Sequence, residues 1–143
     1  MVYKFCCYLD SLLNLKYADE FTDLATVGIE ADVMNLKDLE VRTIINKGMS
    51  GFKNPLLKAM VQKDKFHFAG KELTPFNITW YISPFINAIS RTGTIEEKYI
   101  VFSSMIEYLA EQTVPSTKRG SKPGDLELLI EQALRVCTNV KNR

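Results

Sequence analysis

Hydrophobic positions along the chain fall mostly at the spacing of a helix. In residues 2–13 the apolar side chains recur every three or four positions, which is typical of an amphipathic helix with a mostly buried stripe. A similar pattern fills residues 37–48, where Gly48 is expected to end the helix. Further helices are predicted at residues 55–61, 94–111 and 126–143.

Capping residues indicate where several of these helices begin. Asn54 is followed by a proline, and this pair is typical of a first helical turn because the asparagine side chain accepts hydrogen bonds from free backbone amides. Thr94 with Glu97 three positions later matches a capping box. Asp125 is the expected N-cap of the last helix.

Short strands are predicted at two places. Residues 24–29 form an apolar run that fits either a buried strand or a buried helical turn, and periodicity does not separate the two. Ile78, Trp80 and Ile82 alternate with other residues, which favours a strand, and Pro84 then ends that strand or begins a short helix. Such strands would be the trailing part of a parallel α/β domain.

Two polar stretches are predicted to connect these elements. Residues 63–75 fit a loop or a small hairpin with Gly70 at its turn, and residues 113–125 are rich in Pro, Gly, Ser and Lys, as loops are. The first helix starts without an N-cap and the last runs out without a C-cap. We therefore expect a segment of a longer protein.

Composition narrows the class of protein. The 143 residues suffice for one compact domain, and their 46% hydrophobic content is ordinary for a soluble globular protein. A net charge of +1 gives no global basic field, so nucleic acid would have to be bound by local patches. Three cysteines without a CxxC pair, and a single histidine, argue against a structural zinc site and favour reduced thiols in a cytoplasmic protein. No apolar run is long enough to span a membrane, and no secretory signal is present.

An acidic pair follows an apolar run in the string TVGIEAD. Glu30 and Asp32 carry hard oxygen donors suited to Mg²⁺ or Mn²⁺, and such a cation activates water in phosphodiester cleavage. We expect the pair at the rim of a cleft, because buried unpaired carboxylates are costly. Taken alone, an exposed acid on a loop or at a helix end is the commoner explanation.

Basic and amide side chains offer two candidate phosphate contacts. Asn87 and Arg91 are four positions apart, so on a helix they share a face and could bind a phosphate together. Lys118 and Arg119 lie in the expected loop and could contact a nucleic-acid backbone. A structural asparagine with a surface arginine, and a merely solvated basic loop, are the commoner explanations.

Aromatic residues gather around position 80. Trp80, Tyr81 and Phe85 could stack on the bases of a single strand. Packing in the core is the commoner role for aromatic side chains at this spacing.

Two strings resemble motifs of the RecJ-type single-strand DNA exonucleases in the DHH phosphoesterase superfamily, in a phage or Firmicutes variety. Residues 23–49 resemble the fourth motif of that family, in which an apolar strand leads to Gly-x-x-Ala-Asp, and Asp32 takes the place of its metal-binding aspartate. Residues 82–91, ISPFINAISR, resemble the string Ile-Gly-Pro-Arg-Ile-Asn-Ala-Ala-Gly-Arg, with Asn87 and Arg91 matched. Phe85, Ser90 and Glu30 depart from the family pattern.

The resemblance implies an α/β parent domain, of which this chain is a mainly helical piece with one or two short strands. Residues 1–112 would be the C-terminal part of a DHH domain, 113–125 a loop, and 126–143 a helix leading toward a DHHA1-type domain. The parent would hydrolyse single-stranded DNA from the 5′ end with Mn²⁺ or Mg²⁺, with Asp32 as one ligand and Asn87 and Arg91 along the DNA. No catalytic set is complete in this chain, so we expect it to be inactive alone.

Other interpretations remain open. A different DHH phosphoesterase, acting on cyclic dinucleotides or short oligonucleotides, would carry the same motifs. A small helical interaction protein would make the TVGIEAD string coincidental. A fragment cut from its sheet would also expose apolar surface and self-associate.

Overall fold

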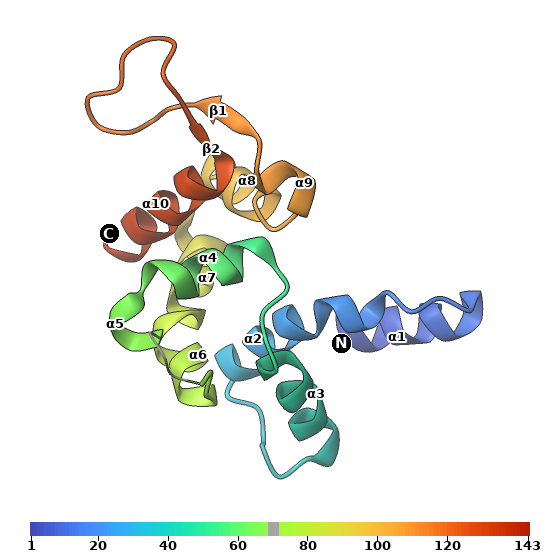
Figure 1. Cartoon of the computed structure of the whole chain (residues 1–143). Coiled ribbons are helices and arrows are strands. Elements are labelled where there is room, and N and C mark those ends of the chain that lie inside the picture. The colour runs from blue at the N-terminus through green and yellow to red at the C-terminus, as the bar shows by residue number, and fades with distance from the viewer. Residues whose placement is uncertain (69–71) are drawn as a thin grey trace.

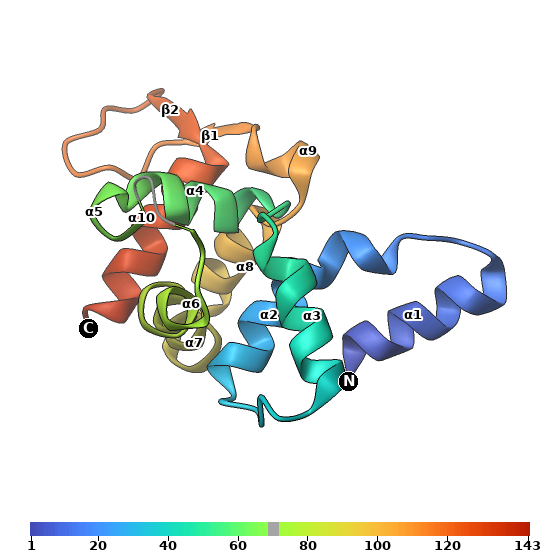
Figure 2. The ribbon, with the colours of Figure 1, turned by 60° about the horizontal axis from the view of Figure 1, so that its bottom comes forward.

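The structure is a computed structural model and describes residues 1–68 and 72–143. That part of the chain is mainly helical and carries one small hairpin, as Figures 1 and 2 show. The mainly helical prediction is confirmed. The elements are α1 (Val2–Leu13), the 3-10 turn η1 (Ala18–Phe21), α2 (Thr22–Ala31), α3 (Leu39–Met49), α4 (Pro55–Lys63), α5 (Lys65–Phe68), α6 (Pro75–Tyr81), α7 (Ser83–Thr92), α8 (Ile95–Ser103), α9 (Glu107–Ala110), β1 (Thr113–Pro115), β2 (Leu126–Leu128) and α10 (Leu129–Lys141).

The hydrophobic core lies where α2, α4, α6, α7, α8 and α10 meet. Helix α7 holds a central place because it contacts both α2 and α10, which are separated by about a hundred residues of sequence. Its buried Ile89 belongs to the same cluster as buried residues from α2, α4, α5, α6, α8 and α10. The fully buried members of that cluster are Leu56, Leu57, Ile78, Ile82, Ile89, Val101, Ala133 and Cys137.

Residues 24–29, for which the sequence left a buried strand or a helical turn open, lie within helix α2. The helical alternative is therefore correct. Its first turn is fixed by Asp23, a buried residue whose Oδ2 accepts hydrogen bonds at 2.7 Å from the backbone amides of Lys53 and Asn54. Asp23 therefore ties the start of α2 to the start of α4. Asn54 in turn caps α4 as predicted, because its side chain accepts from the first amides of that helix.

The predicted strand at residues 78–82 is wrong. A capping box between Thr74 and Asn77 starts helix α6 there instead. Ile78 and Ile82 are four positions apart, so they also share one face of a helix, and both are fully buried. Trp80 distinguishes the two patterns, because its side chain is 61% exposed rather than lying on the same face as the isoleucines.

The helix starts at Pro84 and Thr94 agree with the sequence prediction, but the end of the helix that follows α7 does not. Pro84 begins a helix, the second of its two expected roles, in the first turn of α7. The capping box of Thr94 and Glu97 is confirmed, but α8 ends at Ser103 and α9 follows separately. At this break the Ser104 hydroxyl donates to the carbonyl of Val101 at 2.7 Å, a local bond of the kind that competes with helical pairing.

The strands that do form lie at the edges of the expected loop. β1 pairs antiparallel with β2, so they are not the trailing strands of a parallel sheet. Asp125 does not cap the last helix, because its carboxylate accepts from the amide of Lys122 within the hairpin loop. Helix α10 begins later, after Leu128, without a side-chain cap.

Gly48 lies inside α3 rather than ending it. A Cβ atom at this position would lie 2.2 Å from Oγ1 of Thr26, so α2 and α3 approach each other more closely than any side chain at position 48 allows. The predicted stop was therefore wrong, and the glycine is needed for packing instead.

Helix α1 forms where predicted, but its stripe is not buried. No residue of α1 is buried, and Val2 and Leu12 are exposed on its surface. The helix lies at the edge of the molecule (Figure 2). Polar contacts hold it there, such as the ion pair of 2.6 Å between Lys4 and Glu40. The expected self-association of the chain stays a prediction, which this exposed surface makes reasonable.

The stretch at residues 63–75 contains the short helix α5, and its expected turn residue Gly70 lies outside the described residues. In the described part of the chain, no helix is both long and apolar enough to cross a membrane.

Candidate nucleic-acid interface

Asp32, the candidate metal ligand, lies at the C-terminal cap of α2. Its side chain is exposed, and its backbone amide donates to the carbonyl of Gly28, as is usual where a helix ends. Among residues 1–68 and 72–143, no three His, Cys, Asp or Glu side chains are grouped so that they could hold a metal ion. Mg²⁺ takes six oxygen ligands, several of which are usually waters, and Asp32 would supply one of them.

Glu30 and Asp32 do not face a common cleft. The Glu30 side chain is buried between α2 and α6, and its Oε2 accepts from the Thr79 hydroxyl at 3.1 Å. Its Oε1 is buried without a hydrogen-bond partner among the described residues. The expectation that both acids line one rim is therefore wrong, because two positions along a helix turn the side chains to different faces.

Asn87 and Arg91 lie together on one face of α7, as their spacing predicts. They line a shallow groove of about 490 Å³ between α7 and the end of α10. Lys141 and Arg143 line the opposite side of this groove. Three of its side chains are therefore cationic, and Arg91 has no ion-pair partner among the described residues. We call this feature the α7–α10 groove.

Two contacts set the positions of the cations from α10. The Lys141 ammonium lies 4.3 Å from the centroid of the Phe85 ring, within the range of a cation–π interaction. Arg143 forms an ion pair with Glu97, and its Nη1 lies 3.3 Å from Oε2 of that carboxylate. The backbone amide of Thr94, and after it Arg143, lower the pKa of Glu97. Arg143 is thus partly neutralised, whereas neither Arg91 nor Lys141 has an ion-pair partner within residues 1–68 and 72–143.

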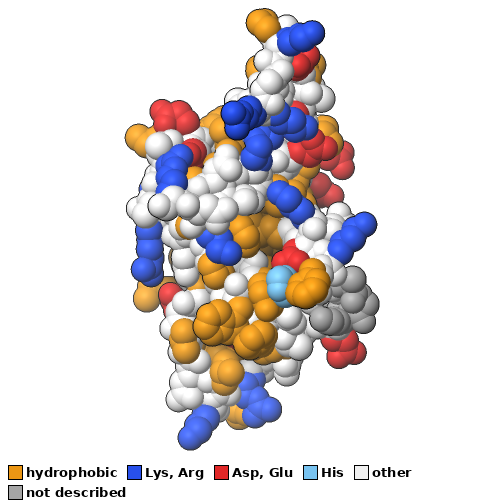
Figure 3. Space-filling model, turned by 90° about the vertical axis from the view of Figure 1, so that its left-hand side faces the viewer, with side chains coloured by type: hydrophobic (Ala, Val, Ile, Leu, Met, Phe, Trp, Pro, Cys, Tyr) orange, Lys and Arg blue, Asp and Glu red, His pale blue; other side chains and the backbone are white. Residues whose placement is uncertain are grey.

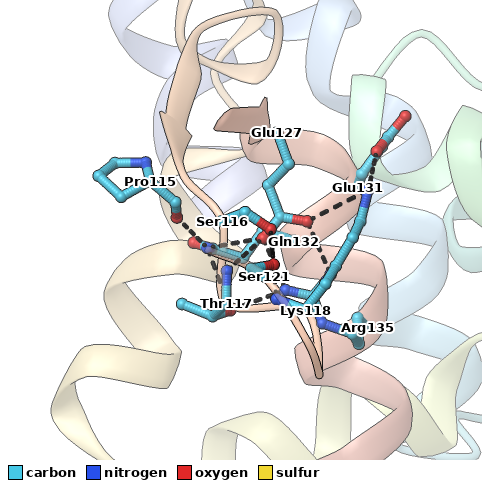
Figure 4. A network of polar contacts seen from close by, with 9 residues as sticks. All are labelled: Pro115, Ser116, Thr117, Lys118, Ser121, Glu127, Glu131, Gln132 and Arg135. Atoms are coloured by element: carbon cyan, nitrogen blue, oxygen red, sulfur yellow. Dashed lines mark hydrogen bonds and ion pairs between the residues drawn. The ribbon is translucent and has the colours of Figure 1, made fainter. Parts of the chain in front are cut away.

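The basic residues of the loop are placed differently. Lys118 lies 2.9 Å from a carboxylate oxygen of Glu131 and 3.6 Å from one of Glu127, so its charge is already paired (Figure 4). Arg119 is exposed beside it. Glu131 and Lys141 are at opposite ends of α10, about 15 Å apart along the helix axis. The structure therefore does not bring Lys118 into the α7–α10 groove.

A polar network holds the hairpin against α10, as Figure 4 shows. At its centre is Glu127, whose side chain is fully buried and which pairs with Arg135 through both oxygens at 2.7 Å. Gln132 and the backbone amide of Thr117 also donate to Glu127. The Arg135 guanidinium is the main cause that lowers the pKa of Glu127 to about 2, and it outweighs the effect of burial.

Sequence reasoning missed two groups of residues here. Lys141 and Arg143 were passed over because they gain their neighbours only when α10 packs on α7. Glu127 was passed over because nothing in its local pattern shows that an acid is buried. The spacing of Lys141 could have indicated its position, because it follows the buried Cys137 by four residues and therefore shares a helix face with it.

Comparison with known proteins shows which curated proteins have a similar sequence. No protein-family model matches the chain, and no solved structure matches it. Two curated proteins do, each at 36% identity over 141 residues, which is 99% of this chain. The chain is similar to part of a protein named as a DNA exonuclease. That protein is provisionally named SPbeta prophage-derived single-strand DNA-specific exonuclease YorK in Bacillus subtilis strain 168, and its counterpart yorK is from Bacillus phage SPbeta.

The match covers only part of YorK. The chain spans 24% of the length of either relative. The similarity thus extends along nearly the whole of this chain and includes both α2 with Asp32 and α7 with Arg91.

Proposed function

We propose that this chain forms a DNA-contacting part of a single-strand-specific DNA exonuclease and does not cleave DNA alone. The observation that carries the proposal is the similarity to YorK at 36% identity over 141 residues. Because the chain spans 24% of that protein, the activity of a complete enzyme is part of the same proposal. That enzyme would hydrolyse phosphodiester bonds from the 5′ end, with Mn²⁺ or Mg²⁺.

The α7–α10 groove supports a role in binding the DNA backbone. The guanidinium of Arg91 can hold a phosphate through two parallel hydrogen bonds, and the Asn87 amide can add a donor beside it. Lys141 adds a point charge from the opposite wall. Since the net charge of the chain is only +1, the attraction for a polyanion must come from such a local cluster.

Asp32 fits the proposal as one member of a larger ligand set. It is exposed at the C-terminal end of α2, a helix that packs against α7. The remaining ligands would have to come from outside the described residues, because no cluster is present within them. Lys118 and Arg119 would at most extend the DNA path along the hairpin.

No contact in the described part of the structure favours either of the other two interpretations over a DNA exonuclease. A cyclic-dinucleotide phosphoesterase and a purely structural interaction protein are both compatible with a helical chain, but neither accounts for a similarity to a DNA exonuclease along nearly all of it.

The proposal is tested on the purified 143-residue chain with fluorescently labelled DNA. We expect it to bind single-stranded DNA more tightly than a duplex of the same sequence, and to release no nucleotides when Mn²⁺ is added. Release of nucleotides would show that the chain holds a complete active site. Failure to bind single strands at low salt would remove its DNA-contacting role.

A further inference from the structure

A small pocket opens beside the α7–α10 groove, between α4, α6, α7 and α10. It encloses about 230 Å³. Six of the side chains that line it are Met60, Lys63, Tyr81, Phe85, Leu134 and Cys137. Figure 3 views the side of the molecule on which α5 and the end of α10 lie, and it shows hydrophobic side chains gathered on that face with Lys and Arg side chains above and below them.

The aromatic side chains of this pocket are held in place by their neighbours. The Tyr81 ring stacks on the imidazole of His67, with ring centroids 3.7 Å apart and planes 23° from parallel. His67 is itself fixed by Asp64, at 2.7 Å from Nδ1. Phe85 carries the Lys141 ammonium over its ring. Two rings with fixed positions are preorganised to receive a third flat ring at a small cost in entropy.

The size and charge of the pocket limit what it can take. Its volume lies below the roughly 300–1,000 Å³ of a site for a complete small molecule. It therefore suits one planar ring rather than a whole nucleotide. Lys63 and Asp64 both line the pocket wall, so the pocket itself carries one charge of each sign. Lys141 lies between the pocket and the groove, so a ligand with a flat part in the pocket and a negative charge toward the groove matches this arrangement.

We propose that this pocket binds one unstacked base of single-stranded DNA while the adjoining phosphate lies in the α7–α10 groove. The proposal rests on the proposed function, because it requires a single strand in that groove. Phe85 connects the two parts, since it lines the pocket and holds the Lys141 that lines the groove. A base in a duplex is stacked and paired, so the pocket would favour single strands over duplexes.

The test compares two ligands of about 12 nucleotides on the intact chain, one of thymidines and one with the same backbone and abasic sites. We expect the thymidine strand to bind roughly tenfold more tightly, by fluorescence anisotropy at matched salt. Equal affinity for the two strands would show that the pocket does not bind a base, and would leave the proposed function intact. Binding of neither would remove both.

A substitution in the pocket tests whether the preference for the thymidine strand arises there. Phe85→Leu keeps an apolar side chain but removes the ring, and it should erase the difference between the two strands without abolishing binding. Phe5→Leu, which removes an exposed ring from α1, is the matched control and should leave the difference unchanged. A Phe85→Leu chain that still prefers the thymidine strand would contradict the assignment. If that variant fails to fold by circular dichroism, the wild-type comparison of the two strands still decides.

Discussion

Arg135 reaches back from α10 to Glu127 at the end of the hairpin and donates to both of its carboxylate oxygens at 2.7 Å. This pair joins β2 to the helix that follows it, and through Thr117 it also holds the loop. Because the Glu127 side chain is fully buried, the pair is a structural feature rather than a surface contact.

The Glu127–Arg135 pair predicts a loss of stability in acid. The pKa of Glu127 is lowered from 4.5 to about 2 in the folded chain, so its contribution is complete above about pH 4.5 and is lost as the pH falls toward 2. Glu127→Gln should lower the free energy of unfolding at neutral pH by roughly 3 kcal/mol, because Arg135 is left unpaired. Thermal unfolding at pH 6 and pH 3 should show a smaller pH effect in the variant.

Glu131→Gln is the control for this measurement, because that carboxylate is exposed and pairs only with Lys118 among the described residues. Its cost should stay below about 1 kcal/mol. An equal cost for the two variants would mean that Glu127 is not buried in solution.

Two glycines provide a matched test of the packing of α2 on α3. Gly48→Ala should lower the free energy of unfolding by about 2 kcal/mol, because the new methyl group would clash with Thr26 and the backbone of Thr22. Gly28→Ala on α2 meets nothing within 4 Å and should stabilise the helix by up to about 1 kcal/mol. Denaturant unfolding of both variants gives the values, and a neutral Gly48→Ala would show that the two helices are not in close contact.

The three cysteines should differ in reactivity. Burial raises the pKa of the Cys137 thiol to about 12, so only about one molecule in ten thousand carries the thiolate at pH 8. Cys6 and Cys7 are only half-buried on α1. A thiol reagent such as DTNB should therefore modify two cysteines in the native chain and the third only after denaturation. Rapid reaction of all three would show that α10 opens readily.

Asp32 can be tested once the chain is placed in a complete nuclease. Replacing the matching segment of YorK by this chain gives a chimera whose nuclease activity is compared with that of YorK itself. Asp32→Asn in the chimera should lower cleavage by at least a hundredfold while single-strand binding is retained, because the substitution removes the charge that a metal requires. Glu20→Gln, an exposed acid on η1, is the control. Full activity of the Asp32→Asn chimera would exclude Asp32 as a ligand.

Sequence-based prediction succeeded where the structure depends on a contact between residues that are close in the sequence. The caps at Asn54 and Thr94 were predicted because each depends on a side chain and an amide two or three positions away. The strand at residues 78–82 failed because an isoleucine at both ends satisfies the period of a strand and that of a helix alike. The antiparallel hairpin was missed because its strands are only three residues long and are held by α10.

The candidate site was also predictable only where it depends on residues close together in the sequence. The shared face of Asn87 and Arg91 follows from their spacing on one helix, and the structure has it. The opposite wall of the groove does not follow, because Lys141 is fifty residues from Arg91 and reaches it only through the packing of two helices. The burial of Glu30 was also beyond sequence reasoning, since it depends on α6 being a helix that presents Thr79.

The central claim is that the α7–α10 groove binds the phosphates of single-stranded DNA, and the salt dependence of that binding tests it most directly. Arg91→Gln should weaken binding and reduce the slope of log affinity against log salt by about 1, the value for one lost phosphate contact. Lys16→Gln, an equal loss of charge on the exposed segment after α1, should change neither quantity. Equal slopes for the wild-type and Arg91→Gln chains would contradict the claim.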